Sequence, residues 1–142
     1  MKAFVKGFTG MVGSHLADYL PEHTNWEIYG MSRRLSPFDN VEHFLDRANR
    51  KDRLHFIDGD LCDYASLLNA VEESRPDYVF HLSAQKYPLT SLISPLQTLD
   101  NNVLGTEHLC RYEWPIFFSH PKPNQFFKYK MRKQHTKVRK DF

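Results

Sequence analysis

The 142-residue sequence has few cysteines and no long apolar run, and each lack excludes a class of protein. Its two cysteines, Cys62 and Cys110, form neither a metal-ligand nor a redox spacing, so we expect inert buried thiols, no metal site and a reducing cytoplasm. No apolar stretch approaches the roughly 18–20 residues needed to cross a bilayer, and the N-terminus lacks the features of a signal peptide. Hydrophobic residues still make up 41% of the chain. The sequence therefore predicts one cytoplasmic domain with its own core.

Glycine is also scarce, and its distribution divides the chain. All six glycines lie before residue 111. Residues 1–110 carry 10 Lys and Arg against 15 Asp and Glu, whereas residues 111–142 carry 9 against 2, which gives net charges of −5 and +7. Such a break in composition indicates two unlike parts. We expect a partial nucleotide-binding domain over residues 1–110 and a basic, aromatic tail of no recognised fold over residues 111–142.

Short apolar segments alternate with segments of helical periodicity in the first part. Strands are expected over residues 3–6, 26–31, 54–58 and 78–82. Helices are expected over residues 11–20, 40–50, 65–73 and 95–110. The first helix should end at Pro21, and its apolar residues at helical spacing are Val12, Leu16, Tyr19 and Leu20. The order indicates right-handed βαβ units. The predicted fold class is therefore α/β, a Rossmann-type doubly wound parallel sheet that stops after about the fourth or fifth strand. A fifth strand over residues 116–118 would lie among three prolines.

A glycine-rich turn at residues 7–13, Gly-Phe-Thr-Gly-Met-Val-Gly, joins the first strand to the first helix. Gly7 lets the chain turn sharply, Gly10 lets the backbone approach a pyrophosphate, and Gly13 lets the helix pack closely on the sheet. The free N–H groups of the first helical turn then face negative charge. Glycine is common in turns of every kind. The motif indicates phosphate binding because a strand precedes it and a helix follows it. The residues predicted to form this phosphate-binding turn are Gly7, Thr9, Gly10, Met11, Val12 and Gly13.

Four motifs in this order resemble the short-chain dehydrogenase superfamily, especially its extended branch of nucleotide-sugar epimerases and dehydratases. The glycine turn is the first. Gly-Asp-Leu-Cys-Asp at residues 59–63 is similar to the adenine-binding Asp-Leu-x-Asp, and His-Leu-Ser-Ala-Gln at residues 81–85 is similar to His-Leu-Ala-Ala-Gln. Residues 94–106 resemble the helix that follows. Residues 33–43 resemble the segment after the second strand in GDP-mannose 4,6-dehydratases and related GDP-sugar reductases.

The resemblance implies an NADP-dependent enzyme that acts on GDP-mannose or a related GDP-sugar. The intact enzyme would oxidise the sugar at C4, eliminate water across C5 and C6 and return the hydride at C6. That chemistry needs a tyrosine, a lysine, a hydroxyl residue and a carboxylate base. Most of these should lie beyond residue 110, so we predict no catalytic residue in the first part and no metal.

The end of the second strand bears on the choice of cofactor. An acidic residue there usually meets the free ribose of NAD, but this chain has Arg33 and Arg34. Guanidinium groups suit the 2′-phosphate of NADP, although either arginine alone could extend into solvent instead. By resemblance, Asp60 accepts the adenine amino group, and the nicotinamide ribose lies near the end of the fourth strand. The residues implied for these contacts are Asp60, Leu61, Leu82, Ser83, Ala84 and Gln85. A solvent-facing Gln85 is nearly as well supported.

Lys6 and His81 each allow two interpretations. Lys6 stands where the family has threonine, and it either strains the turn or adds positive charge near the phosphates. The sequence does not decide between these two effects. His81 precedes the ligand-binding edge within a buried strand, which favours a satisfied core histidine over a catalytic one.

The tail departs from the family pattern. Tyr129 and Lys133 formally match the family's Tyr-x-x-x-Lys pair, but Tyr129 follows Gly105 too closely for the helix, strand and loop that should intervene. A truncated or frame-shifted reading of a longer enzyme accounts for this best. Two alternatives remain: a non-catalytic NADP-binding module, and a tail that binds nucleic acid or a protein partner through its basic and aromatic residues. A solvated charged tail explains the composition more simply than nucleic-acid binding. Exposed strand edges would favour association into a homo-oligomer.

Overall fold

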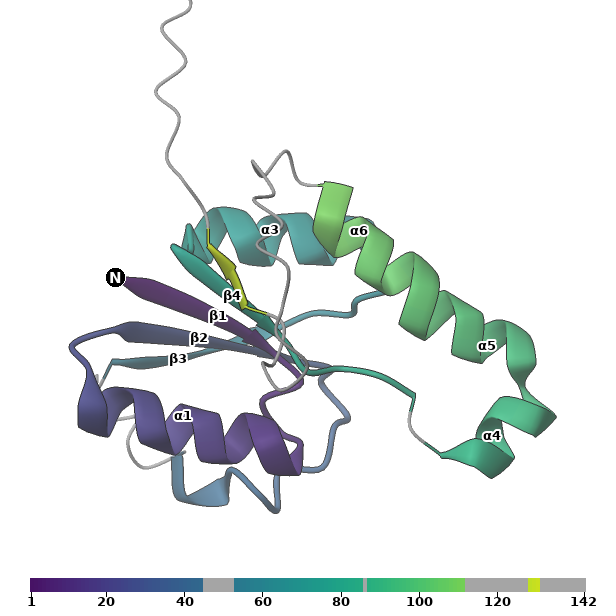
Figure 1. Cartoon of the computed structure of the whole chain (residues 1–142), viewed down its shortest axis with the longest axis horizontal. Helices are drawn as coiled ribbons and strands as arrows, with labels where there is room; N and C mark the ends of the chain where they lie inside the picture. Colours follow the sequence, from purple (N-terminus) through teal and green to yellow (C-terminus); the bar gives the residue numbers. More distant parts are fainter. Residues whose placement is uncertain (45–52, 86, 112–127, 131–142) are drawn as a thin grey trace, which may run out of the picture.

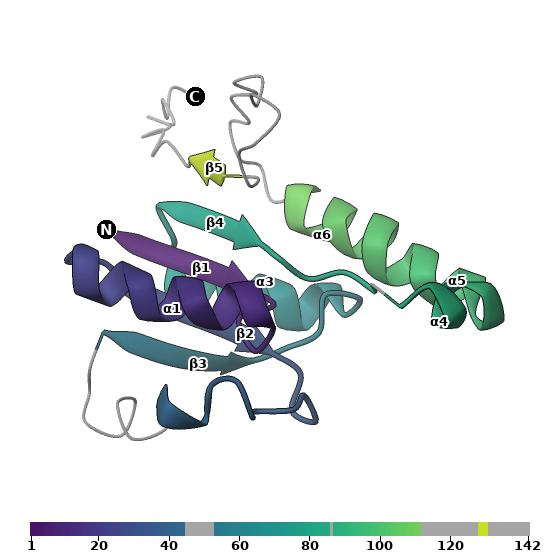
Figure 2. The same ribbon diagram turned by 60° about the horizontal axis from the view of Figure 1, so that its bottom comes forward.

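In the part of the chain that the structure describes, five strands form one sheet, with helices on both of its faces (Figure 1). The computed structural model describes residues 1–44, 53–85, 87–111 and the backbone of 128–130. The strands are β1 (Lys2–Lys6), β2 (Glu27–Ser32), β3 (Leu54–Asp58), β4 (Tyr78–His81) and β5 (Lys128–Lys130). Their order across the sheet is β3-β2-β1-β4-β5. The first four strands are parallel, as the predicted α/β fold requires, whereas β5 runs antiparallel to β4 (Figure 2).

The central strand β1 divides the core into two layers. Ala3, Phe4 and Val5 are fully buried, because β1 has a neighbouring strand on each side and helices above and below. Successive side chains of a strand point to opposite faces. Phe4 therefore packs with the residues of one core cluster, and Ala3 and Val5 pack with those of the other. Lys6 follows Phe4 by two positions and shares its face, which α3 covers (Figure 2).

The helices lie between and after the strands. They are α1 (Met11–His23), α3 (Tyr64–Ser74), α4 (Pro88–Ile93), α5 (Pro95–Leu99), the π-helical turn η1 (Asp100–Leu104) and α6 (Gly105–Arg111). Helix α1 covers one face of the sheet, and α3 and α6 lie on the other (Figure 1). Asp63 caps α3, since its carboxylate accepts the N–H of Ala65 at 3.1 Å. No described helix is long and apolar enough to cross a membrane.

Helix α1 differs from the sequence prediction in its end and in its buried face. Pro21 lies inside the helix, which continues to His23. A proline in the last turn removes a single helical hydrogen bond, and its carbonyl still accepts one from Arg53 at 2.6 Å. Small residues make most of the contact with the sheet, whereas Val12 and Tyr19 are exposed. The buried residues of α1 are Gly13, Ser14, Ala17 and Leu20.

The helix expected over residues 95–110 is present as a continuous helical run from Pro95 to Arg111, with a π-helical turn in its middle, and α4 before it was not predicted. The π-helical turn η1 separates α5 from α6 and places Asn102 against the strand-to-helix connection. Leu96, Leu99, Val103 and Leu109 are the apolar residues that predict this helix, but Leu109 is the one that is buried, and the other three are exposed. The apolar spacing therefore did not identify a core-facing stripe here.

The structure also bears on the predictions for the two thiols, the helix over residues 40–50 and the fifth strand. Cys62 is exposed and Cys110 is only partly buried, so the prediction of buried thiols was wrong. The expected helix over residues 40–50 is described only as far as residue 44, where Val41 and Phe44 are buried in the core. The possible fifth strand over residues 116–118 lies outside the described residues, as does Lys133.

Candidate functional site

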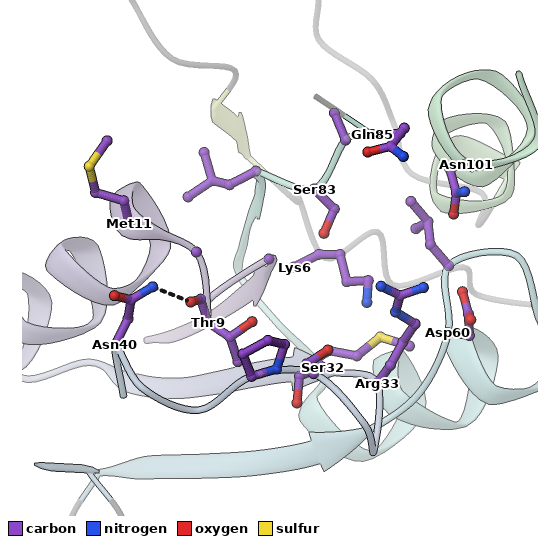
Figure 3. A pocket seen from close by; sticks show the side chains of 18 of the residues that line it. Lys6, Thr9, Met11, Ser32, Arg33, Asn40, Asp60, Ser83, Gln85 and Asn101 are labelled. Carbon is purple, nitrogen blue, oxygen red and sulfur yellow. Dashed lines mark hydrogen bonds between the residues drawn. The ribbon is translucent and has the colours of Figure 1, made fainter. Parts of the chain in front are cut away.

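A pocket of about 610 Å³ opens at the carboxyl ends of the four parallel strands (Figure 3). Strand β1 lies between β2 and β4, so the connections from neighbouring strands leave in opposite directions at this point. Open α/β sheets bind their ligands at such a point, where side chains do not fill the gap between the diverging connections. The segments that follow β1, β2, β3 and β4 all contribute to the lining.

The turn after β1 is held by short backbone contacts. Gly7 has a φ of +88°, a conformation that favours glycine, and a Cβ there would lie 2.8 Å from the carbonyl carbon of Leu82. The N–H of Gly10 donates to the carbonyl of Gly7 at 3.1 Å. The side chain of Asn40 donates to the carbonyl of Thr9 at 3.0 Å, which ties the turn to the segment after β2 (Figure 3).

Gly10 and Gly13 serve different purposes within this turn. A Cβ on Gly13 would lie 2.3 Å from the carbonyl oxygen of Gly7 and 2.5 Å from the Cα of Phe8, so α1 needs glycine there to approach the sheet. A Cβ on Gly10 would meet only the Gly7 oxygen, at 3.2 Å. Gly10 lines the pocket, and Gly13 does not. The start of α1 carries no acidic residue to oppose an anion there.

Only one of the two arginines predicted for phosphate recognition lines the pocket. Arg33 and Ser32 line it (Figure 3), and Ser36 does so as well. The N–H of Ser36 donates to the carbonyl of Arg33 at 2.9 Å and closes a turn there. Arg34 is exposed and does not contribute to the lining.

Asp60 occupies the opposite wall, after β3. Its carboxylate accepts the N–H of Cys62 at 3.0 Å, and its own N–H donates to the hydroxyl of Ser66 at 3.0 Å. The first bond orients the carboxyl group, and the second holds the backbone of Asp60. The N-terminus of α3 is capped by Asp63 and not by Asp60. Leu61 is buried and completes this wall.

Lys6 reaches into the pocket from the end of β1 (Figure 3). The residue is 5% exposed, and its ammonium group donates to the carbonyl of Gly59 at 3.5 Å. Burial lowers the pKa of Lys6 to about 8, with Asp60 opposing this effect and Arg33 adding to it. The turn after Lys6 keeps its hydrogen bond. The ammonium group therefore lies in the same pocket as the glycine turn, without breaking the hydrogen bond of that turn.

The segment after β4 forms the remaining wall, to which Leu82, Ser83, Ala84 and Gln85 all contribute. Asn102 holds the backbone of Gln85 on both sides: its side-chain oxygen accepts the Gln85 N–H at 2.7 Å, and its amide donates to the Gln85 carbonyl at 3.2 Å. This pair ties the wall to η1. Gln85 is partly buried.

His81 is only half satisfied. Its Nε2 lies 3.0 Å from the hydroxyl of Thr106, but its buried Nδ1 has no hydrogen-bond partner among the described residues. Burial lowers the pKa of His81, and the nearby charge of Lys6 adds to this effect. His81 does not line the pocket.

The structure brings most of the predicted site residues together in one cavity. The exceptions are Val12, Gly13 and Arg34. Sequence reasoning missed the polar residues Ser36, Asn40, Gln97 and Asn101, which also line it. Asn40 is 31 residues from its partner Thr9, and no local pattern in the sequence signals such a contact. No cluster of possible metal ligands occurs among the described residues.

The chain is similar to known proteins in both sequence and fold. The family model for GDP-mannose 4,6 dehydratase matches residues 4–112. GDP-mannose 4,6-dehydratase of Yersinia enterocolitica is 34% identical over 111 residues, which cover 76% of this chain and 30% of that protein. The chain thus spans about 30% of the length of this curated relative.

Solved structures share the fold. UDP-glucose 4-epimerase of Thermotoga maritima, solved with UDP-glucose, superposes with a TM-score of 0.64 and 25% identity, covering 77% of this chain and 32% of that one. UDP-glucose 4-epimerase of Stenotrophomonas maltophila, solved with bound NAD, superposes with a TM-score of 0.63 and 24% identity. The match covers 78% of this chain and 32% of that one.

Proposed function

The chain belongs to the GDP-mannose 4,6 dehydratase family, and on this basis we propose that it is the NADP-binding portion of a nucleotide-sugar dehydratase. The family implies a nicotinamide cofactor. The observation that carries the choice of NADP is the position of Arg33, which lines the same pocket as the glycine turn. An acidic residue at this point would instead favour the free ribose of NAD.

Each wall of the pocket has a proposed part in holding the dinucleotide. The pyrophosphate would lie against Gly10, where no side chain intrudes and where the N–H groups at the start of α1 are free of helical partners. Asp60 would accept the adenine amino group, with Leu61 against the ring. Arg33 would bind the 2′-phosphate through its planar set of donors. The nicotinamide ribose would lie against the residues that follow β4.

Bound in this way, the dinucleotide supplies a hydride acceptor for the sugar. We propose a GDP-sugar such as GDP-mannose as the substrate of the complete enzyme, oxidised at C4 before water is lost across C5 and C6. Among the described residues we assign no catalytic acid or base. Residues 1–111 supply the cofactor site, and the sugar must be held within reacting distance by further structure.

The two arginines provide a matched test of this proposal. Affinities for NADP and NAD are measured by calorimetry on the 142-residue chain and on the Arg33→Ala and Arg34→Ala variants. Loss of a charge-assisted contact costs roughly 1.5–3 kcal/mol, so Arg33→Ala should weaken NADP by about 10- to 100-fold. NAD affinity should not change, and Arg34→Ala should behave like the unmodified chain. A chain that prefers NAD, or equal losses in the two variants, would contradict the proposed role of Arg33.

A further inference from the structure

The buried ammonium group of Lys6 has too few partners for the place it occupies. Lysine is almost never fully buried unless it is paired, yet Lys6 is only 5% exposed. An ammonium group can donate three hydrogen bonds. Within the described part of the chain Lys6 makes one, to the carbonyl of Gly59, and 3.5 Å is longer than the 2.7–3.2 Å usual for such bonds.

The charged groups around Lys6 do not compensate for its burial. Asp60, from the segment after β3, attracts the ammonium group, and Arg33, from the segment after β2, repels it. Lys6 also interacts electrostatically with the Cys62 thiol, two residues after Asp60, and with His81 of β4. Figure 3 shows the end of the Lys6 side chain directed toward the guanidinium group of Arg33. Two cations that converge in one pocket form a favourable position for an anion of high charge.

The fold indicates which anion this is. The phosphate of NADP that NAD lacks is attached to the ribose that carries adenine. Adenine is assigned to the wall formed by Asp60, and the ribose phosphate to Arg33 at the end of β2. Lys6 lies between these two walls, since both residues act on its charge and all three line the pocket.

We propose that the Lys6 ammonium group is a second cationic contact for the 2′-phosphate of NADP, beside Arg33, and that it makes the preference for NADP over NAD dependent on pH. This inference rests on the proposed function, because it requires a dinucleotide in the pocket. It concerns a residue at which the chain departs from the threonine of the family pattern.

The direction of the pH dependence follows from linkage. The pKa of Lys6 in the unliganded protein is about 8, and a dianionic phosphate beside the ammonium group raises it. The second pKa of a phosphate ester is about 6, so the phosphate is already dianionic above neutral pH. Binding must therefore take up a proton as pH rises past the free pKa. NADP affinity then falls by up to about tenfold per pH unit until the pKa of the complex is reached.

Lys6→Met provides the direct test, because methionine keeps much of the length and removes the charge. Lys2→Met is the matched control: it removes a lysine at the other end of the same strand, where the ammonium group lies against Tyr29 and outside the pocket. Calorimetry with NADP and with NAD is carried out at about pH 7 and about pH 9.5. Thermal unfolding checks that each variant is folded.

We expect Lys6→Met to weaken NADP by about 10- to 100-fold at neutral pH and to leave NAD affinity unchanged. It should also remove the fall in NADP affinity between the two pH values, while Lys2→Met retains both properties. As a measurement on the unmodified chain, NADP titrations near pH 8.5 in buffers of different ionisation enthalpy should show proton uptake, and NAD titrations should show none.

The outcomes separate this inference from the function on which it rests. A chain that binds neither dinucleotide contradicts the proposed function. If the preference for NADP needs Arg33 but survives in Lys6→Met, and NADP binding takes up no proton, the inference about Lys6 is overturned and the proposed function stands. Equal weakening of NADP and NAD in Lys6→Met also overturns it, because the ammonium group would then bind the pyrophosphate that both dinucleotides share.

Discussion

Replacing Gly13 by alanine should destabilise the fold, whereas the same replacement at Gly10 should remove dinucleotide binding from a folded chain. A Cβ on Gly13 would lie 2.3 Å from the Gly7 oxygen and 2.5 Å from the Phe8 Cα, against an optimal separation of roughly 3.5–4.0 Å for carbon contacts. Both obstacles are backbone atoms, so α1 itself must move by about 1 Å. Overpacking of this kind costs about 1–3 kcal/mol, and we expect the upper end.

Two smaller effects modify these values. Alanine has a higher helix propensity than glycine, which stabilises the Gly13→Ala variant by about 1 kcal/mol. The free energy of unfolding should therefore fall by about 2 kcal/mol in total. In a domain of this size, that loss lowers the melting temperature by about 8 °C. At Gly10 the new Cβ meets one atom at 3.2 Å, and the backbone there is extended, which alanine adopts freely. Alanine is a poorer cap than glycine, so we expect a loss of no more than about 1 kcal/mol.

The assay combines thermal unfolding followed by circular dichroism with calorimetric titration of NADP. Gly10→Ala should melt close to the unmodified chain and lose NADP affinity, because its methyl group occupies the proposed place of the pyrophosphate. Gly10→Val should abolish binding. A Gly13→Ala variant with an unchanged melting temperature would refute the close approach of α1 to the turn. Unchanged NADP affinity in Gly10→Val would refute the assignment of the phosphate to this turn.

Three further predictions concern turnover, association and pH. The 142-residue chain incubated with NADP and GDP-mannose should form no 4-keto sugar detectable by mass spectrometry; product that disappears in Tyr129→Phe would show that the tail is catalytic. Leu92 and Leu96 are 79% and 75% exposed, so changing both to glutamate should reduce self-association in light scattering, and an unchanged mass would exclude this surface. The pKa of Lys6 is about 8 in the folded chain against 10.5 in the unfolded chain, so the folded state binds fewer protons between these values. The free energy of unfolding of the unmodified chain should therefore rise with pH across that range relative to Lys6→Met, and parallel profiles in chemical denaturation would contradict this.

The parallel strands and the glycine turn could be predicted because their signals are local. Strand β3 begins and ends at the predicted residues, and the turn at Gly7 and Gly10 follows β1 as its spacing indicates. Apolar runs bounded by turn residues carry this information without knowledge of the rest of the fold. The cap of α3 at Asp63 is local in the same sense, since donor and acceptor are two residues apart.

The differences arise where distant contacts decide the local conformation. Asn102 holds the backbone of Gln85, 17 residues away, and the π-helical turn that presents it cannot be read from apolar spacing. Gly105 packs so closely that a Cβ would lie 2.7 Å from the side chain of Leu61. Arg33 and Arg34 are adjacent in the sequence, and only the turn after β2 determines which of them lines the pocket.

The lining residues of the proposed cofactor site are confined to one part of the chain. Among the described residues the pocket lining begins at Lys6 and ends at Asn101, and all of these lining residues lie within the segment matched by the family model. Strand β5 lies beyond that segment and pairs with β4 through its backbone (Figure 2). Backbone pairing at a sheet edge tolerates many sequences, so this strand does not require the family pattern to continue. Dinucleotide affinity should therefore depend on residues 6–101 and be insensitive to substitutions after Arg111, whereas any turnover must depend on structure outside the pocket.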